Sequence, residues 1–259
     1  MIQEPWIDSY SNSHGSQYWQ VIYPVNFHED HPRICSLLLI NTNLTIDCYV
    51  TLPILHSDIT AIRFKGTSSF LSLFNIYNEI TNNDTLACLD SFSELNVQTI
   101  RPSPTDSVVW LGNFNRHHPM WEDNENKWLF NMEDNIALLI NLLYKYDMVL
   151  ALPKGIPTLQ TSAGNWTRPN SVWRNSTLAD PVLRCHTVPA IRPPLADHLP
   201  IITILDLPFP RSSVDSSLNF READWPGICT NLKQRLEGAT PAKHIESHRE
   251  FIKKVDDIT

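Results

Sequence analysis

Four short sequence patterns combine residue types that can act on a phosphate ester. Each pattern comes at the end of a run that is typical of a strand, where side chains can meet at one edge of a sheet. They are Gln3-Glu4-Pro5, Asn75-Ile76-Tyr77-Asn78, Gly112-Asn113-Phe114-Asn115 and Ala196-Asp197-His198-Leu199-Pro200. The adjacent carboxylate and imidazole of Asp197 and His198 suit metal binding and stabilisation of phosphate charge. Because strand side chains alternate, Asn113 and Asn115 are predicted to point to the same face.

Each pattern also has a simpler interpretation when it is considered alone. An Asp-His pair in a loop, such as Asp197-His198, is commonly solvent-exposed and without a functional role. Asn113 and Asn115 could cap a turn. Tyr77 could be a core or rim aromatic, and Glu4 could be a solvated carboxylate. The residue types alone therefore leave the assignment of a site open.

The elements that would position these residues are mostly strands. Nine runs are rich in β-branched and aliphatic residues and are bounded by turn formers. The predicted strands are Gln20–Val25, Arg33–Asn41, Ile59–Phe64, Phe70–Asn78, Ser107–Asn115, Asp147–Leu152, Ser171–Asn175, Arg184–Val188 and Leu199–Leu207. Two segments, Asp84–Leu95 and Glu133–Tyr146, repeat apolar residues at helical spacing. These elements favour two packed mixed sheets with helices outside.

Length, charge and glycine spacing exclude several classes of protein. The chain has 259 residues, and 20 Lys and Arg against 28 Asp and Glu give a net charge of −8. This charge argues against a general nucleic-acid coat protein, whose affinity would depend on a basic surface. It permits an enzyme that acts on phosphodiesters through a metal held by acidic groups. The seven glycines lie at least nine residues apart, so a dinucleotide fingerprint and a P-loop are both absent.

The cysteine pattern and the first residues of the chain indicate the cellular compartment in which the protein is expected. The five cysteines form no C-x-x-C pair, which argues against a zinc ribbon and a secreted disulfide framework. The polar start Met1–Pro5 does not resemble a signal peptide. The apolar run Ile136–Leu152 is interrupted by polar residues, so no membrane-spanning helix is expected. We therefore expect a cytoplasmic or nuclear protein that is not secreted and has no membrane partner.

The composition changes near Pro208-Phe209-Pro210. This change predicts a main domain over 1–210 and a linker with a short helical tail over 211–259. Two helical segments are expected in the tail, Trp225–Leu236 and Pro241–Val255.

The order of the four patterns along the chain resembles the endonuclease/exonuclease/phosphatase superfamily. The run from Gly112 to Trp121, GNFNRHHPMW, is similar to the GDFN-x-HHP-x-W block of the endonuclease domain of LINE-type (non-LTR) retrotransposon polyproteins. The resemblance covers roughly residues 1–207. Further similar segments are Gln3-Glu4-Pro5-Trp6, Leu73–Asn78, Thr167-Arg168-Pro169-Asn170 and Ala196–Ile201. The resemblance implies a four-layer α/β sandwich, two packed mixed β-sheets flanked by helices, and it implies DNA as the substrate.

The resemblance also implies roles for individual residues. Glu4 would bind one divalent cation, Mg²⁺ or alternatively Mn²⁺, and Asp197 would support the metal or the attacking water. His198 would stabilise the charge of the phosphorane. Tyr77 would contact the scissile phosphate, and Asn115 would orient it. Residues implied to face the substrate are Thr158, His117 and His118.

Three departures from the family pattern lower the expected activity. The aspartate that activates water in the family is Asn113 here, and the aspartate that orients the histidine is Asn170. Asparagine keeps the shape of aspartate but cannot accept a proton or carry charge. Loss of a positioned acid or base reduces a rate by about 10²–10⁴. The family's first strand, which carries an asparagine ligand, precedes the position of Met1, so this chain is expected to lack it and to expose two sheet edges.

Two functions follow from this resemblance. The first is a Mg²⁺-dependent phosphodiesterase or DNA endonuclease that nicks target DNA for retrotransposition, attenuated or inactive and with weakly bound metal. The second is a non-catalytic pseudoenzyme or retroelement relic that binds at most nucleic acid or protein. Beyond residue 210, Asn219-Phe220-Arg221 and Asp224-Trp225 resemble the linker to a reverse transcriptase. That domain is expected downstream in a full-length polyprotein and is absent from this sequence.

Overall fold

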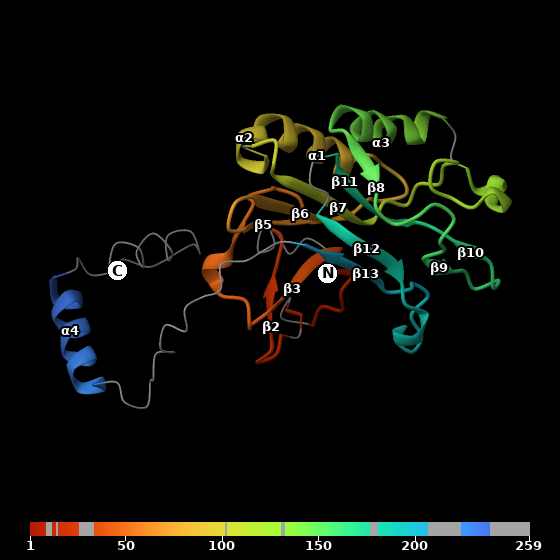
Figure 1. Ribbon diagram of the computed structural model, residues 1–259. Coiled ribbons are helices and arrows are strands. Elements are labelled where there is room, and N and C mark those ends of the chain that lie inside the picture. The colour runs from red at the N-terminus through yellow and green to blue at the C-terminus, as the bar shows by residue number, and fades with distance from the viewer. Residues whose placement is uncertain are drawn as a thin grey trace. The chain divides into compact units, whose positions relative to one another are not determined.

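The computed structural model in Figure 1 describes residues 1–8, 12–13, 15–25, 34–101, 103–130, 133–176, 181–206 and 224–238. The chain divides into two compact units, Met1–Arg211 and Ser212–Thr259. Within the second unit, the described segment contains helix α4 (Trp225–Gly238). The other helix expected in the tail, Pro241–Val255, lies outside the described residues. In the described parts of the chain, no helix combines the length and the apolarity needed to cross a membrane.

The first unit is built around a six-stranded mixed sheet with the order β4-β5-β6-β7-β11-β8. Strands β6 and β7 run parallel, and the other neighbours in the sheet are antiparallel. The central strands carry nearly continuous buried residues, which is typical of strands covered on both faces. The strands of this sheet are β4 (Tyr49–Thr51), β5 (Ile59–Lys65), β6 (Phe70–Tyr77), β7 (Ser107–Asn113), β8 (Met148–Leu150) and β11 (Asn170–Asn175).

Smaller antiparallel sheets supply the remaining strands. One has the order β1-β3-β2, a second pairs β12 with β13, and a third is the β9–β10 hairpin. A second hydrophobic cluster, which includes Leu38, Val109 and Leu152, packs between the larger sheet and these strands. The strands are β1 (Ile2–Gln3), β2 (Trp19–Ile22), β3 (Ser36–Asn41), β9 (Leu159–Gln160), β10 (Trp166–Thr167), β12 (Val182–Thr187) and β13 (Ile201–Leu205).

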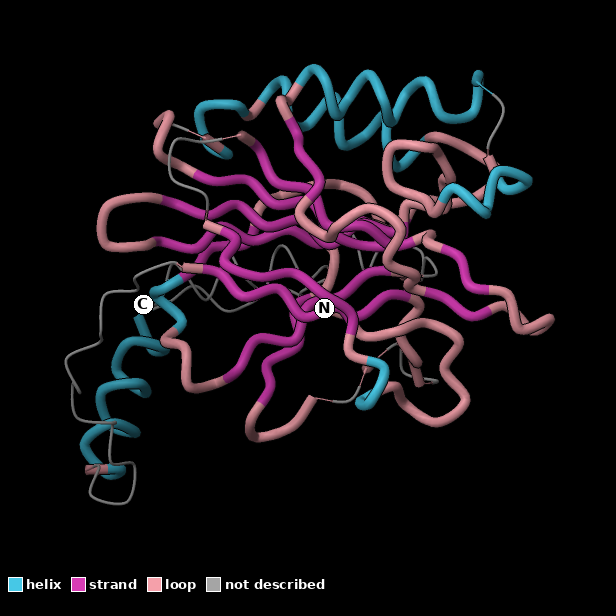
Figure 2. Tube along the Cα trace, turned by 45° about the vertical axis from the view of Figure 1, so that its right-hand side comes forward, coloured by secondary structure: helices cyan, strands magenta, loops and turns pink. Residues whose placement is uncertain are grey.

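Helices α1 (Asp84–Leu95), α2 (Val97–Ile100) and α3 (Glu133–Lys145) cover one face of the six-stranded sheet, as Figures 1 and 2 show from two directions. Their apolar residues recur at helical spacing and join a cluster with Phe74 and Trp110 of the sheet. Three short 3₁₀ helices complete the described elements: η1 (Ile46–Cys48), η2 (Asn124–Leu129) and η3 (Pro189–Ile191). The expected α/β sandwich of packed sheets with flanking helices is confirmed.

A strand of the structure overlaps each of the nine runs that the sequence predicts, and α1 has the predicted bounds. The short strands β1, β4, β9 and β10 were not predicted, because two or three residues are too few to show a periodic pattern. Strand β7 ends at Asn113, whereas the prediction continues to Asn115. The difference arises because Asn115 adopts a left-handed backbone conformation with φ 49°, which ends the extended chain.

Candidate functional site

Residues from all four sequence patterns line or adjoin one cavity of about 760 Å³, here called the central cavity. This volume lies within the range of roughly 300–1,000 Å³ that small-molecule sites occupy. The strands contribute these residues where they begin or end, so the polar groups gather at one end of the cavity. The polar end is lined by Glu4, Asn113, Asn170, Asp197 and His198.

Asn113 and Asn170 lie directly opposite each other on the paired strands β7 and β11. Asn113 is buried, and its Oδ1 accepts a hydrogen bond of 3.0 Å from the backbone N–H of Asn115. Asn170 donates from Nδ2 to Oε1 of Gln3 at 3.2 Å, and its Oδ1 is buried with no hydrogen-bond partner among the described residues. The two asparagines that the sequence resemblance matches to aspartates therefore lie opposite each other on the wall of the cavity.

Gln3 connects this pair to the neighbouring strand. Its Nε2 donates to the carbonyl oxygen of Ile76 at 2.8 Å, while its Oε1 accepts from Asn170. Gly112 makes this close approach possible, because a Cβ atom at residue 112 would lie 1.9 Å from that carbonyl oxygen and 2.2 Å from Nε2 of Gln3. Gly112 also has φ 142°, a conformation that residues with side chains rarely adopt. The glycine of the motif is therefore needed for backbone and side-chain packing at the site.

Glu4 follows strand β1 and presents an exposed carboxylate at the cavity. The hydroxyl of Tyr77 donates to Oε1 of Glu4 at 3.1 Å. Burial raises the pKa of Tyr77 above its usual range, and the negative charge of Glu4 acts in the same direction. The phenol therefore remains protonated and serves as a fixed donor to the carboxylate.

The donor set at the polar end fits a weakly held divalent cation. Mg²⁺ commonly binds one or two carboxylates and completes its shell with water and substrate phosphate. Glu4 and Asp197 supply two exposed carboxylates on the cavity wall, and the unpartnered Oδ1 of Asn170 supplies a neutral oxygen. Among the described residues, no cluster of three or more His, Cys, Asp or Glu side chains is placed to hold a metal ion. Such a site would therefore depend on water and phosphate for most of its ligands.

His198 comes just before strand β13, and backbone contacts with the segment around Leu159 hold it in place. Residue 198 forms an isolated β-bridge with Leu159, and the N–H of Leu199 donates to the carbonyl of Thr158 at 2.8 Å. Burial lowers the pKa of His198, while the charges of Asp197 and Glu4 oppose this shift. Nδ1 of His198 is buried and has no hydrogen-bond partner in the described structure. The imidazole therefore lacks the orienting acceptor that an aspartate would provide.

The extended strand that was predicted to carry both Asn113 and Asn115 ends at Asn113. Nδ2 of Asn115 donates to the carbonyl oxygen of Asn78 at 2.8 Å, and Asn115 is not among the residues that line the central cavity. The chain turns after Phe114, which is buried and whose N–H donates to the carbonyl of Pro169. This turn removes the strand geometry on which the prediction depended.

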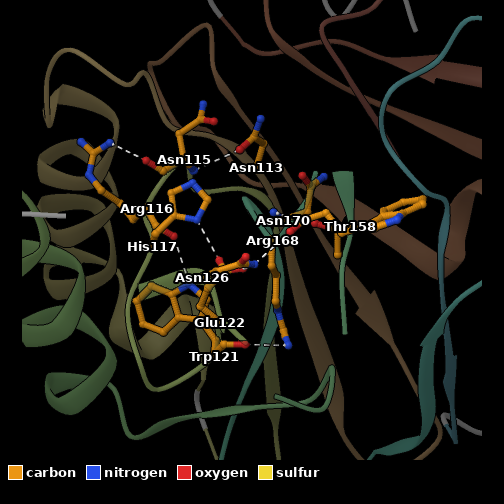
Figure 3. Close-up of polar contacts among 11 residues, drawn as sticks. Asn113, Asn115, Arg116, His117, Trp121, Glu122, Asn126, Thr158, Arg168 and Asn170 are labelled. Carbon is orange, nitrogen blue, oxygen red and sulfur yellow. Dashed lines mark hydrogen bonds and ion pairs between the residues drawn. The ribbon is translucent and has the colours of Figure 1, made fainter. Parts of the chain in front are cut away.

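The three residues implied to face the substrate are not among the residues that line the central cavity. Nδ1 of His117 lies 2.8 Å from Oε2 of Glu122, and Figure 3 shows the imidazole pointing toward that carboxylate. The ring of His118 packs against Trp121 with ring centroids 5.2 Å apart. Thr158 is fully buried, and its Oγ1 accepts from the N–H of Asn170 at 3.2 Å. Contact of these residues with a substrate stays a prediction.

A buried polar cluster supports the polar end from behind and was not anticipated from the sequence. Arg168 donates to the backbone carbonyls of Trp121 at 3.1 Å, of Leu152 at 2.7 Å and of Pro153. Burial lowers the pKa of Arg168 to about 10, and the charge of Glu122 opposes the shift. Figure 3 shows Arg168 reaching below Asn170 toward Trp121. The sequence offers one indication of a role for Arg168 at the site. It stands two residues before Asn170 in the Thr-Arg-Pro-Asn segment.

Comparisons with known proteins support the fold assignment. No family model matches the sequence, and a search of curated proteins finds no match. The chain is similar to the endonuclease domain of TRAS1, a telomere-specific non-LTR retrotransposon, with 12% identity over 74% of this chain and 82% of that chain and a TM-score of 0.58. It is also similar to the AP endonuclease LMAP from Leishmania major, with 12% identity over 72% and 70% of the two chains and a TM-score of 0.55. These likenesses show that the chain has the endonuclease/exonuclease/phosphatase fold.

Proposed function

We propose that this chain binds the phosphate backbone of DNA at the polar end of the central cavity and hydrolyses phosphodiester bonds only slowly. The observation that carries the proposal is the pairing of Asn113 with Asn170 across β7 and β11, on the cavity wall that also presents Glu4, Asp197 and His198. The printed names of the two similar structures, both endonucleases, support nucleic acid as the substrate class. The likeness to the endonuclease domain of TRAS1 supports an origin in a non-LTR retrotransposon. Nicking of target DNA for retrotransposition, with a reverse transcriptase downstream in the polyprotein, is the part of the proposal that the sequence resemblance implies.

Mg²⁺, or Mn²⁺ in its place, would be held by Glu4 with support from Asp197. When bound, the cation would act as a Lewis acid and neutralise charge on the phosphate. Tyr77 would hold the Glu4 carboxylate in position through its 3.1 Å hydrogen bond. Affinity is expected to be low, because hard cations prefer anionic oxygens and the two asparagines contribute neutral ones.

The residues of this chain can bind a phosphate better than they can move a proton. Asn113 can orient a water molecule through its amide, but it cannot accept the proton of that water. The lowered pKa of His198 keeps its imidazole neutral at neutral pH, which allows a hydrogen bond to phosphate but provides no positive charge. Each missing acid or base reduces the rate by about 10²–10⁴, so slow hydrolysis follows from the composition of the site.

One contact favours the second candidate function, a non-catalytic pseudoenzyme. The hydrogen bond from Nδ2 of Asn170 to Oε1 of Gln3 requires an amide at residue 170. An aspartate there would place its carboxylate oxygen against Oε1 unless the Gln3 amide turned over and gave up its bond to Ile76. This hydrogen bond therefore favours the neutral side chain at residue 170 over an aspartate.

Nicking of supercoiled plasmid at millimolar Mg²⁺ tests the proposal. The native chain should nick slowly, and the double variant Asn113→Asp/Asn170→Asp should nick at least about 10²-fold faster. A matched control, Asn43→Asp/Asn165→Asp, adds the same two charges at exposed positions outside the cavity and should leave the rate unchanged. If both the native chain and the restored double variant fail to nick while DNA binding persists, the pseudoenzyme is supported. If neither binds DNA, the proposal is wrong.

A further inference from the structure

A second cavity, of about 410 Å³, lies between the helices and the six-stranded sheet and is here called the helix-side cavity. Its wall includes Val108 and Trp110 of β7, whereas Val109 and Leu111 of the same strand line the central cavity. Because successive side chains of a strand point to opposite faces, the two cavities lie on opposite faces of this sheet. The helix-side cavity is therefore a separate site, and its volume is in the range of roughly 300–1,000 Å³ typical of small-molecule sites.

The helix-side cavity lies where the covering helices end. Helix α1 ends at Leu95, and the short helix α2 ends at Ile100. Helix α3 ends at Lys145, and Asp147 leads the chain into β8 with a left-handed backbone conformation of φ 53°. These helix ends and the start of β8 enclose a space over β7. The apolar side chains on its wall are Val97, Ile100, Val108 and Met148.

Two polar groups on the wall are buried and have no hydrogen-bond partner among the described residues. They are Oγ of Ser93, a residue that is 5% exposed, and Nε1 of Trp110, which is 1% exposed. An indole N–H can only donate, and a hydroxyl can both donate and accept. Buried donors without acceptors are unfavourable, so a molecule that brings acceptor atoms into the cavity would gain hydrogen bonds that the folded chain does not make.

The other neutral polar side chains on the wall are already engaged. The hydroxyl of Tyr146 donates to Oδ1 of Asp90 at 2.8 Å. Oδ1 of Asn175 accepts from the N–H of Val108 at 2.6 Å, and its Nδ2 donates to the carbonyl of Asp106 at 3.5 Å. Recognition of a ligand by neutral side chains therefore depends on the two unpartnered groups.

The charged residues around the cavity favour neither sign of charge. Arg101 and Lys145 line it together with Glu94 and Asp147. Nζ of Lys145 lies 2.7 Å from a carboxylate oxygen of Asp90 and 3.1 Å from one of Glu94, so its charge is already compensated. Positive and negative side chains thus balance, and an ion would lose its hydration on an apolar wall. The cavity therefore favours a ligand without net charge.

We propose that the helix-side cavity binds an uncharged, largely apolar small molecule that carries a carbonyl oxygen. The aliphatic and aromatic wall would cover the apolar part of the ligand and remove it from water. A carbonyl oxygen has two lone pairs, so it can accept both from the indole N–H of Trp110 and from the hydroxyl of Ser93. Water is the competing occupant, because it can also accept from these groups. The proposal goes beyond the proposed function and does not depend on it.

The experiment compares two probes of the same shape on the full chain. Acetophenone carries a carbonyl oxygen, and α-methylstyrene carries a CH₂ group in its place. Binding is followed by NMR through the indole N–H signals of the eight tryptophans, and Trp110→Phe identifies the signal of residue 110 by its loss. The central cavity has no tryptophan on its wall, so the signal of Trp110 reports on the helix-side cavity.

We expect acetophenone to shift the indole proton signal of Trp110 downfield and saturably, because the N–H gains an acceptor, and α-methylstyrene to cause no downfield shift. Ser93→Ala should lower the affinity for acetophenone by about twofold to tenfold and leave that for α-methylstyrene unchanged. Val97→Phe narrows the exposed side of the cavity and should weaken the binding of both probes. Leu95→Phe is its matched control, because residue 95 is 83% exposed and does not line the cavity.

The two probes are compared on the unmodified chain, so the main result does not depend on how the variants fold. Absence of a saturable change in the Trp110 signal with acetophenone would overturn the proposal and indicate that the cavity holds water alone. An equal response to both probes would also overturn it, because the response would then not depend on the carbonyl oxygen.

Discussion

Nδ1 of His117 lies 2.8 Å from Oε2 of Glu122, whose side chain is 1% exposed. The other carboxylate oxygen of Glu122 accepts from Nδ2 of Asn126 at 2.8 Å, and the same amide nitrogen donates to the carbonyl of Trp166. The buried carboxylate therefore connects the loop after β7 with helix η2 and strand β10. This network gives His117 a partner inside the protein, next to the motif that carries Asn113.

Replacement of Glu122 by alanine should lower the free energy of unfolding by about 1–3 kcal/mol. The reason is that the hydrogen-bonding groups of His117 and Asn126 would lose their buried acceptor. Urea unfolding followed by circular dichroism measures the effect. The matched control is Glu125→Ala, which removes an exposed carboxylate nearby and should change stability by less than about 0.5 kcal/mol. Equal effects of the two variants would contradict the proposed network.

Gly112→Ala should be strongly destabilising and should also displace Gln3. A methyl group at residue 112 would overlap the carbonyl of Ile76 and the amide of Gln3, and the backbone at φ 142° is strained for alanine. We expect a loss of about 2–4 kcal/mol in thermal or urea unfolding. Gly164→Ala is the matched control, because residue 164 also has a positive φ of 85° but a Cβ there would meet no atom within 4 Å. A loss no greater than that of the control would show that the close approach is wrong.

Stability should fall as the pH drops below about 6.5, in part because of His118. Burial lowers the pKa of His118 below its ordinary value of 6.5, and its Nδ1 accepts a hydrogen bond from the N–H of Met120 at 3.2 Å. Below pH 6.5 the unfolded chain binds a proton that the folded chain does not, so stability is lost as pH falls toward the lowered pKa. Above pH 6.5 both states are neutral at this residue, and its contribution is fully present.

The His118→Gln variant tests this pH dependence. Tm should be measured for both chains from about pH 8 to about pH 5. The variant should lose less Tm than the native chain over the acidic half of this range. Parallel curves for the two chains would exclude His118 as a source of the dependence.

Tyr77→Phe should weaken the binding of Mg²⁺ without unfolding the protein. The substitution removes the hydroxyl that donates to Glu4 at 3.1 Å but keeps the buried ring. Groups that orient a metal ligand typically contribute about 10–100-fold in affinity. The shift of Tm with Mg²⁺ concentration measures this change. Tyr49→Phe, which removes a hydroxyl bonded to Gln20 away from the cavity, should leave the Mg²⁺ dependence unchanged.

Much of the fold and the composition of the site can be read from the sequence. Buried strands such as β6 and β7 are continuous apolar runs, and α1 shows its apolar face at helical spacing. These signals are local, because the backbone conformation of each element determines which side chains share a face. The two asparagines in place of acids are likewise visible in the motifs. Sequence thus determined the class of fold and the presence of two neutral amides, Asn113 and Asn170, at the candidate site.

Tertiary structure decided which of these residues meet and what surrounds them. Gln3 and Asn170 are 167 positions apart in the chain, yet they share a hydrogen bond. This contact depends on the order β6-β7-β11 and on the register that places Asn170 opposite Asn113. The turn at Asn115, the buried partner of His117 and the lining of the central cavity depend on packing in the same way. Such contacts arise when separate elements assemble, and no local periodicity encodes them.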